Sequence, residues 1–184
     1  MTSEPFELNT ILMRSTFKLA GEGSIGTAFI IGRPKKTDTN KAYYVMVTAS
    51  HVLDDMKGTH ATLFLRSKID NYQKISFQLE IRREGKPLWF RHPDELVDVA
   101  VMYVDLPTDI DICLLSTAML ANDDILKKFE IHPGDELMCL GYPFGAEATE
   151  VGLPILRSGK IASYPLLPTN QIKTFLYDFR VFQG

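Results

Sequence analysis

His51 follows an apolar, strand-like run and is the residue whose type and position best suit proton transfer. The run covers residues 43–49 and is rich in Tyr, Val and Thr, which favour β-structure. An imidazole titrates near neutral pH, so it can accept and return a proton under physiological conditions. A strand that ends just before His51 would hold this side chain in a fixed position. We therefore predict that His51 is a general base.

Asp98 is the second residue that points to chemistry. It lies within the apolar run 96–102, where an unpaired carboxylate would be costly to bury, so we expect it to have a partner. A neighbouring imidazole N–H would serve. Acyl transfer to a serine needs a base, a carboxylate that orients the base, and donors for the oxyanion. His51 and Asp98, in this chain order, could supply the first two.

The sequence around these residues predicts short strands separated by turns. This alternation predicts hairpins rather than β-α-β units. Six strands within about ninety residues suggest a small closed barrel, because closure removes exposed sheet edges. In the first half of the chain we predict strands at residues 14–19, 26–32, 43–49, 62–66, 75–81 and 99–104, with a polar loop at 34–41.

The second half begins with a change of pattern. Residues 122–129 predict a short helix, with Asn122 or an adjacent Asp as its cap and lysines near its end. Strands resume at residues 136–141, 155–163 and 173–178, which is too few for a second complete barrel. We predict an N-terminal barrel at 10–106, a linker with a short helix at 107–133, and a partial C-terminal barrel at 134–184.

The composition of the chain limits the kinds of partner and the location that we expect. The chain has 184 residues, of which 23% are charged, and its net charge of −3 gives no electrostatic reason to expect nucleic acid or a membrane as partner. No apolar run reaches the roughly 18–20 residues that cross a bilayer, and the first residues lack the pattern of a signal peptide. Cys113 and Cys139 are too few for a disulfide framework. We therefore expect a cytoplasmic protein with reduced cysteines.

Five segments together resemble the trypsin-like serine endopeptidases of chymotrypsin fold. The likeness is to the bacterial, disulfide-free branch that includes the high-temperature-requirement proteases. The segments are residues 26–31 (GTAFII), 47–52 (VTASHV), 98–100 (DVA), 134–135 with 141–143 (GD and GYP), and 157–161 (RSGKI). Each segment is weak alone, but all five occur in the family's order. The resemblance covers nearly the whole chain from residue 14 onward.

This resemblance implies roles for particular residues. His51 and Asp98 would be the catalytic histidine and aspartate, and Gly184 would match the first glycine of the family's G-[ND]-S-G-G-P motif. The nucleophilic serine would then stand two places beyond Gly184, and Gly184 would lend one backbone N–H to the oxyanion hole. None of the serines that we considered fits instead, because none has Gly-Gly after it: Ser24, Ser50, Ser116, Ser158 and Ser163.

Arg180 precedes the expected serine in a region that often lines the pocket for the residue before the cut. If its side chain points inward, an acidic or polar residue would be preferred there. His60, His92 and His132 lack the spacing of metal ligands, so we expect no metal and no cofactor.

The sequence thus predicts an all-β fold of two antiparallel six-stranded β-barrels, the second incomplete, with the site between them. The predicted function is a serine endopeptidase that acts on a peptide or protein through an acyl-enzyme, and the 184-residue chain alone is predicted to be inactive. The alternative is a catalytically inactive protease-fold module that binds a peptide or a protein partner. A metal-dependent hydrolase is a remote third reading. Because an incomplete barrel exposes sheet edges, we also expect an oligomer or additional domains beyond Gly184.

Overall fold

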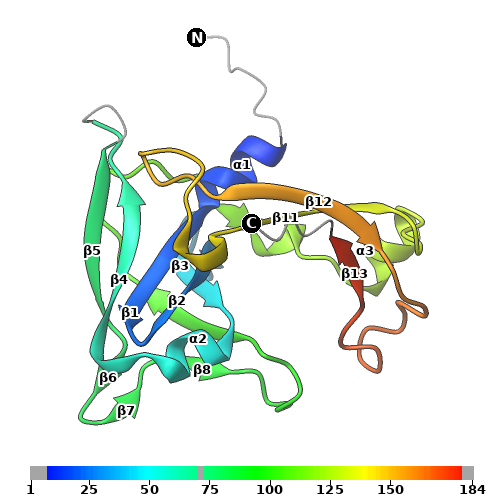
Figure 1. Ribbon diagram of the computed structural model, residues 1–184, viewed down its shortest axis with the longest axis horizontal. Coiled ribbons are helices and arrows are strands. Elements are labelled where there is room, and N and C mark those ends of the chain that lie inside the picture. Colours follow the sequence, from blue (N-terminus) through cyan, green and yellow to red (C-terminus); the bar gives the residue numbers. More distant parts are fainter. Residues whose placement is uncertain (1–7, 70–72, 180–184) are drawn as a thin grey trace. The chain divides into compact units, whose positions relative to one another are not determined.

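The computed structural model describes residues 8–69 and 73–179 (Figure 1). In its first part the chain forms α1 (Leu8–Ser15), β1 (Thr16–Glu22), β2 (Ser24–Lys35), β3 (Asp38–Thr48), α2 (Ser50–Asp55), β4 (Lys57–Arg66), β5 (Lys74–Glu80), β6 (Arg82–Arg83), β7 (Lys86–Pro87), β8 (Phe90–Arg91), β9 (Ala100–Val104) and β10 (Leu115–Ser116). There follow η1 (Thr117–Met119), α3 (Asp123–Lys128), β11 (Glu136–Gly141), η2 (Pro143–Gly145), β12 (Ile155–Ile161) and β13 (Tyr177–Phe179).

The main sheet contains eight strands. Their order is β5-β4-β1-β2-β3-β9-β8, all antiparallel, and β10 pairs in parallel with β2. The predicted all-β, antiparallel class is confirmed. The six predicted strands correspond to β1–β5 and β9, and the two-residue strands β8 and β10 raise the number to eight. Between described residues, no pairing joins β5 to β8, so closure of the barrel stays a prediction.

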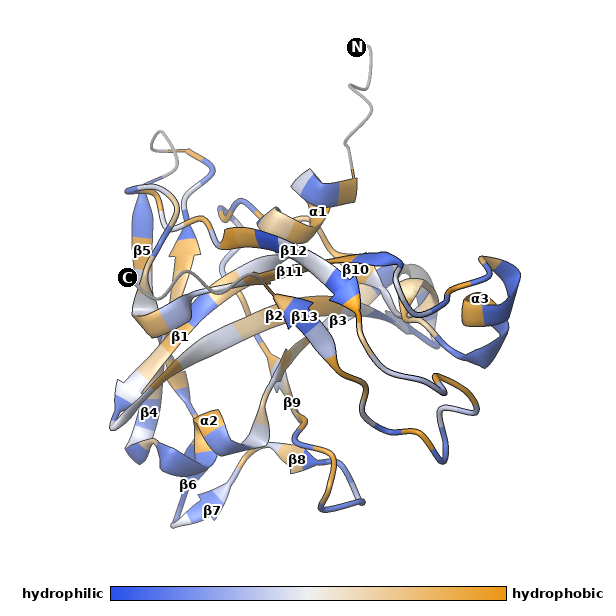
Figure 2. Cartoon of the chain, turned by 45° about the vertical axis from the view of Figure 1, so that its right-hand side comes forward, coloured by the Kyte–Doolittle hydropathy of each residue, from blue (hydrophilic) through white to orange (hydrophobic). Residues whose placement is uncertain are grey.

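The core of this sheet follows from the alternation of apolar residues along its strands. Phe17 and Leu19 on β1, Ile30 on β2, and Leu63 and Leu65 on β4 have no exposed surface. Successive side chains of a strand point to opposite faces, so these residues all lie on the inner face. By contrast, the β6–β7 hairpin is polar and appears in hydrophilic blue in Figure 2.

The outer face of β2 and β3 carries a second, smaller apolar cluster. Ile31, Val45 and Leu115 are buried there, with Ile11 and Leu12 of α1 packed against them. The sequence analysis did not predict α1, because a helix of two turns gives little periodic signal. The apolar residues of α1 are explained by their contact with the apolar outer face of the sheet, which the sequence alone does not reveal.

A segment from the second half of the chain belongs to the first part of the molecule. Contacts divide the chain into a first unit, residues 1–117 with 140–155, and a second unit, residues 118–139 with 156–184. Within the first unit, Arg66 Nη1 donates to the carbonyl of Gly152 at 3.1 Å, and Tyr142 Oη donates to Thr16 O at 3.2 Å. The predicted division at residues 106 and 133 stays a prediction, but residues 140–155 pack with the first unit.

The second unit contains α3 and most of the three-stranded sheet β11-β12-β13. The predicted helix is present, and its cap is Asn122, whose side chain accepts a hydrogen bond from Ile125 N at 2.9 Å. Lys127 and Lys128 lie in its last turn, where they complement the helix dipole. The predicted strand at 136–141 is β11 with the same ends, β12 ends two residues earlier than predicted, and β13 covers only residues 177–179. None of the described helices has the length and apolar character needed to cross a bilayer.

Candidate active site

His51 is the second residue of α2 and follows Thr48, the last residue of β3, by three positions. The local geometry explains its placement. Thr48 Oγ1 donates to Thr27 O at 2.8 Å and so ties the end of β3 to β2, while Val52 and Leu53 of α2 are buried in the core. With its neighbours anchored, His51 projects outward with 63% of its side chain exposed. The predicted strand before the histidine is present as the end of β3, but His51 itself stands in the first turn of α2, a helix that the sequence did not predict.

Gly26 allows α2 to lie against β2. A Cβ atom on Gly26 would stand 2.6 Å from both γ-carbons of Val52, closer than real contacts permit. The glycine of the GTAFII segment is therefore required by the approach of the helix that carries His51. Thr27 connects segment 26–31 to segment 141–143, because its hydroxyl accepts a hydrogen bond from Tyr142 N at 3.0 Å.

Asp98 lies in the loop between β8 and β9, two residues before β9 begins. The loop is held at its base by His92 N, which donates to Val99 O at 2.9 Å. The expectation that the apolar run 96–102 buries Asp98 is wrong, because half of the Asp98 side chain is exposed. The apolar neighbours that suggested burial do not enclose it, since Leu96 and Val99 are themselves exposed.

The structure nevertheless brings His51 and Asp98 together, as the sequence predicted. His51 Nδ1 forms a short hydrogen bond with Asp98 Oδ2. The other oxygen, Oδ1, accepts from the backbone N–H of His51 at 3.0 Å and from Ser50 Oγ at 2.5 Å. Three donors from two consecutive residues therefore converge on one carboxylate.

These donors also set the charge of Asp98. The hydrogen bond from Ser50, followed by those from the His51 side chain and backbone, holds the pKa of Asp98 well below its usual range. The carboxylate is therefore ionised throughout the neutral range. An ionised Asp98 favours the imidazole tautomer with its proton on Nδ1, which leaves the Nε2 lone pair available. Within the described part of the chain, no hydrogen bond engages Nε2.

Ser50 contacts the pair, and the sequence did not predict this contact. It was considered only as a nucleophile and rejected, because no Gly-Gly follows it. Its hydroxyl lies instead behind the carboxylate as a donor. The available signal was a serine directly before the histidine, at the end of a mainly apolar run.

The two remaining predicted site residues lie outside the described residues. Gly184, predicted for the oxyanion hole, and Arg180, predicted to line the substrate pocket, both follow residue 179. Their roles stay predictions. Among residues 8–69 and 73–179, no three His, Cys, Asp or Glu side chains converge as metal ligands would.

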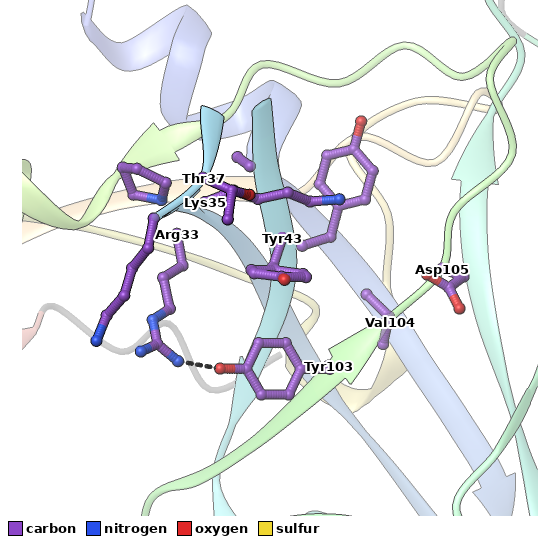
Figure 3. Close-up of a pocket in the computed structure, with 11 residues that line it drawn as sticks. Arg33, Lys35, Thr37, Tyr43, Tyr103, Val104 and Asp105 are labelled. Carbon is purple, nitrogen blue, oxygen red and sulfur yellow. Dashed lines mark hydrogen bonds between the residues drawn. The ribbon is translucent and has the colours of Figure 1, made fainter. Parts of the chain in front are cut away.

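A cavity of about 720 Å³ in the first unit lies elsewhere, at the β2–β3 hairpin (Figure 3). Neither His51 nor Asp98 lines it. Tyr43 and Tyr103 meet edge to face across it at 5.8 Å between ring centroids, and Arg33 donates to the Tyr103 hydroxyl. Lys35 lies over the Tyr43 ring at 4.7 Å. These contacts join the aromatic rings and the cations of the hairpin to one another, so we assign no catalytic role to the cavity.

The chain resembles known proteins in structure but not in sequence. No family model matches the chain, and no curated protein matches it. Solved structures do match, among them an HtrA-type protease, AlgW, solved with a tripeptide. The identity is 17% and the TM-score 0.49, over 86% of this chain and 40% of that chain. At these values the likeness by itself assigns neither activity nor site residues, and the all-β, antiparallel architecture described above is consistent with a chymotrypsin-like fold.

Proposed function

We propose that the chain carries the base and the orienting carboxylate of a serine endopeptidase, whose nucleophile follows Gly184. The observation that supports this best is the contact between His51 Nδ1 and Asp98 Oδ2, with Oδ1 independently held. A histidine pinned on one ring nitrogen by a carboxylate, and exposed on the other, is arranged to act as general base and then general acid.

In the proposed mechanism, His51 Nε2 takes the proton of the serine hydroxyl as the oxygen attacks the peptide carbonyl. Asp98 stabilises the imidazolium that forms. When the tetrahedral intermediate collapses, His51 returns the proton to the leaving amine, and an acyl-enzyme remains. Water then attacks the ester while His51 takes its proton, and His51 returns that proton to the serine oxygen as the acid product leaves. Gly184 N–H would stabilise the oxyanion, and Arg180 would line the pocket for the residue before the cut. No metal or cofactor takes part in these steps.

The proposal extends to partners and location. Its substrate is a peptide or a protein, and other chains or domains beyond Gly184 complete the second barrel. A cytoplasmic location suits Cys113 and Cys139, which are both free thiols.

The decisive experiment uses the chain extended past Gly184 by its own coding sequence. If a G-N-S-G-G-like motif follows, a fluorophosphonate probe is expected to label its serine, and His51→Ala is expected to abolish the labelling. Asp98→Asn should lower turnover by about 10⁴-fold, as expected when an orienting carboxylate loses its charge. The matched control is His60→Ala, which removes another exposed histidine of the first unit and should leave labelling unchanged.

Two results would contradict the proposal. One is a serine in the expected place that the probe does not label. The other is labelling that survives His51→Ala. A stop codon or a substituted serine at that place would instead favour the non-catalytic module that binds a peptide or a protein.

A further inference from the structure

We propose that Ser50 is a positioning residue that aims the Asp98 carboxylate at His51 by holding its far oxygen. The catalytic meaning of this inference rests on the proposed function, but the interaction itself does not. Ser50 is not part of the predicted triad, and its hydroxyl makes no attack on substrate. Its proposed task is to stop the carboxylate from rotating.

The two oxygens of the Asp98 carboxylate have different partners. Oδ1 accepts from Ser50 Oγ at 2.5 Å and from His51 N at 3.0 Å, while Oδ2 faces the imidazole alone. The terminal torsion of an aspartate is soft, with broad and roughly two-fold preferences. Two donors on Oδ1 restrain that torsion, so Oδ2 stays aimed at His51 Nδ1.

Ser50 is more buried than the two residues of the pair, which strengthens the hydrogen bond from its hydroxyl. The side chains of His51 and Asp98 are 63% and 50% exposed, so water competes with their pairing. Ser50 is only 9% exposed. Of the two side chains that contact the carboxylate, Ser50 is thus the one shielded from solvent. A hydrogen bond from a shielded donor to a charged acceptor is among the stronger ones in proteins.

The position of Ser50 is itself fixed by α2. It is the first helical residue, it is followed by the buried pair Val52 and Leu53, and it comes two residues after Thr48, which is tied to β2. At the start of a helix a serine hydroxyl commonly caps a backbone N–H, but the cap position belongs to Ala49, which has no side-chain bond. The Ser50 hydroxyl is directed to Asp98 instead.

Electrostatics agrees with this geometry. Among the causes that lower the pKa of Asp98, the hydrogen bond from Ser50 is the largest, ahead of those from His51. The functional consequence follows from the tautomer. A fixed, anionic Oδ2 selects the Nδ1–H imidazole and leaves the Nε2 lone pair free to accept a proton.

The test uses the 184-residue chain in solution and needs no turnover. Nuclear magnetic resonance would follow the Asp98 carboxyl carbon during a pH titration and the two His51 ring nitrogens. In Ser50→Ala, the pKa of Asp98 should rise by at least about half a pH unit, because one donor to the charged form is lost. The His51 ring should also lose part of its Nδ1–H tautomer. Ser50→Thr keeps a hydroxyl and should restore both signals.

The control is Ser15→Ala, which removes a different buried serine hydroxyl, one that donates to the backbone carbonyl of Leu12. It should leave both signals of the site unchanged. If Ser50→Ala does not fold, Ser50→Cys keeps the shape with a weaker donor and should shift both signals in the same direction. Unchanged titration and tautomer in the folded variant would overturn the proposal.

In an active, extended chain, Ser50→Ala should lower kcat by about tenfold at unchanged KM, a fraction of the roughly 10²–10⁴-fold that a general base supplies. Failure of the proposed function would appear differently. A chain without peptidase activity could still show the titration and tautomer changes, which concern the folded pair alone.

Discussion

Phe144 has a solvent exposure and a backbone conformation that are both unusual for phenylalanine. Its side chain is fully exposed, and its backbone is left-handed, with φ 53° and ψ 25°. This conformation costs an ordinary L-residue roughly 1–2 kcal/mol, and asparagine tolerates it better. We predict that Phe144→Asn raises the free energy of unfolding by about 1 kcal/mol, since no buried contact is lost. Urea denaturation would measure the change.

Phe175→Asn is the matched control, because Phe175 is also exposed but has no left-handed backbone. Its stability should stay within about 0.5 kcal/mol of the parent chain. An equal gain at both positions would show that polarity, and not backbone strain, is responsible.

At the scale of elements, the seat of α2 on β2 depends on Gly26. We predict that Gly26→Ala lowers the free energy of unfolding by about 1–3 kcal/mol, because the added methyl group overlaps Val52. The displaced helix should also weaken the contact between His51 and Asp98. Urea denaturation would measure stability, and the amide signals of residues 49–52 would report the displacement.

Gly32→Ala provides the comparison within the same strand. A Cβ atom there would meet its nearest atoms, on Ala42 and Leu114, at 3.5 Å, which is an ordinary contact. Alanine is preferred over glycine in a strand by roughly 0.5–1 kcal/mol, so this variant should be neutral or slightly more stable. Equal losses in the two variants would disprove the specific role of Gly26.

At the scale of the whole molecule, Glu147 ties the returning segment 140–155 to the main sheet. It forms ion pairs with Lys18 of β1 and, at 2.7 Å, with Lys74 of β5. Burial alone would raise the pKa of Glu147, but the hydrogen bonds and charges of the two lysines lower it overall. Because the folded pKa is below the unfolded value, this stabilisation is complete above about pH 4.3 and is lost as the pH falls through the folded pKa.

We therefore predict that Glu147→Gln lowers the free energy of unfolding by about 2 kcal/mol at pH 7, and that the difference from the parent chain shrinks below about pH 4. Chemical denaturation at a series of pH values would measure it. Glu150→Gln, at an exposed neighbour, should leave the pH dependence unchanged. A constant difference at every pH would show that the charge of Glu147 is not the cause.

Part of the fold and of the site could be read from the sequence, because local patterns encode local structure. The alternating residues of β3 and β9 predicted both strands, and Asn122 predicted the start of α3. Chain order predicted that His51 and Asp98 would meet. Other features depend on contacts between distant residues, and no local pattern carries them. The hydrogen bond from the Ser50 hydroxyl to Asp98 is one such feature. The exposure of the Asp98 side chain, despite its apolar neighbours in the sequence, is a second.

The return of residues 140–155 to the first unit also determines when that unit can be completed during synthesis. Arg66 and Thr16 obtain partners from Gly152 and Tyr142. These partners leave the ribosome only after residues 118–139 have been made. At about 5–20 residues per second, residues 118–155 take roughly 2–8 s to synthesise. For that time the nascent first unit already has its other strands, and Arg66 can reach the carbonyls of residues 13, 14 and 16, but the bonds to Gly152 and from Tyr142 are still missing.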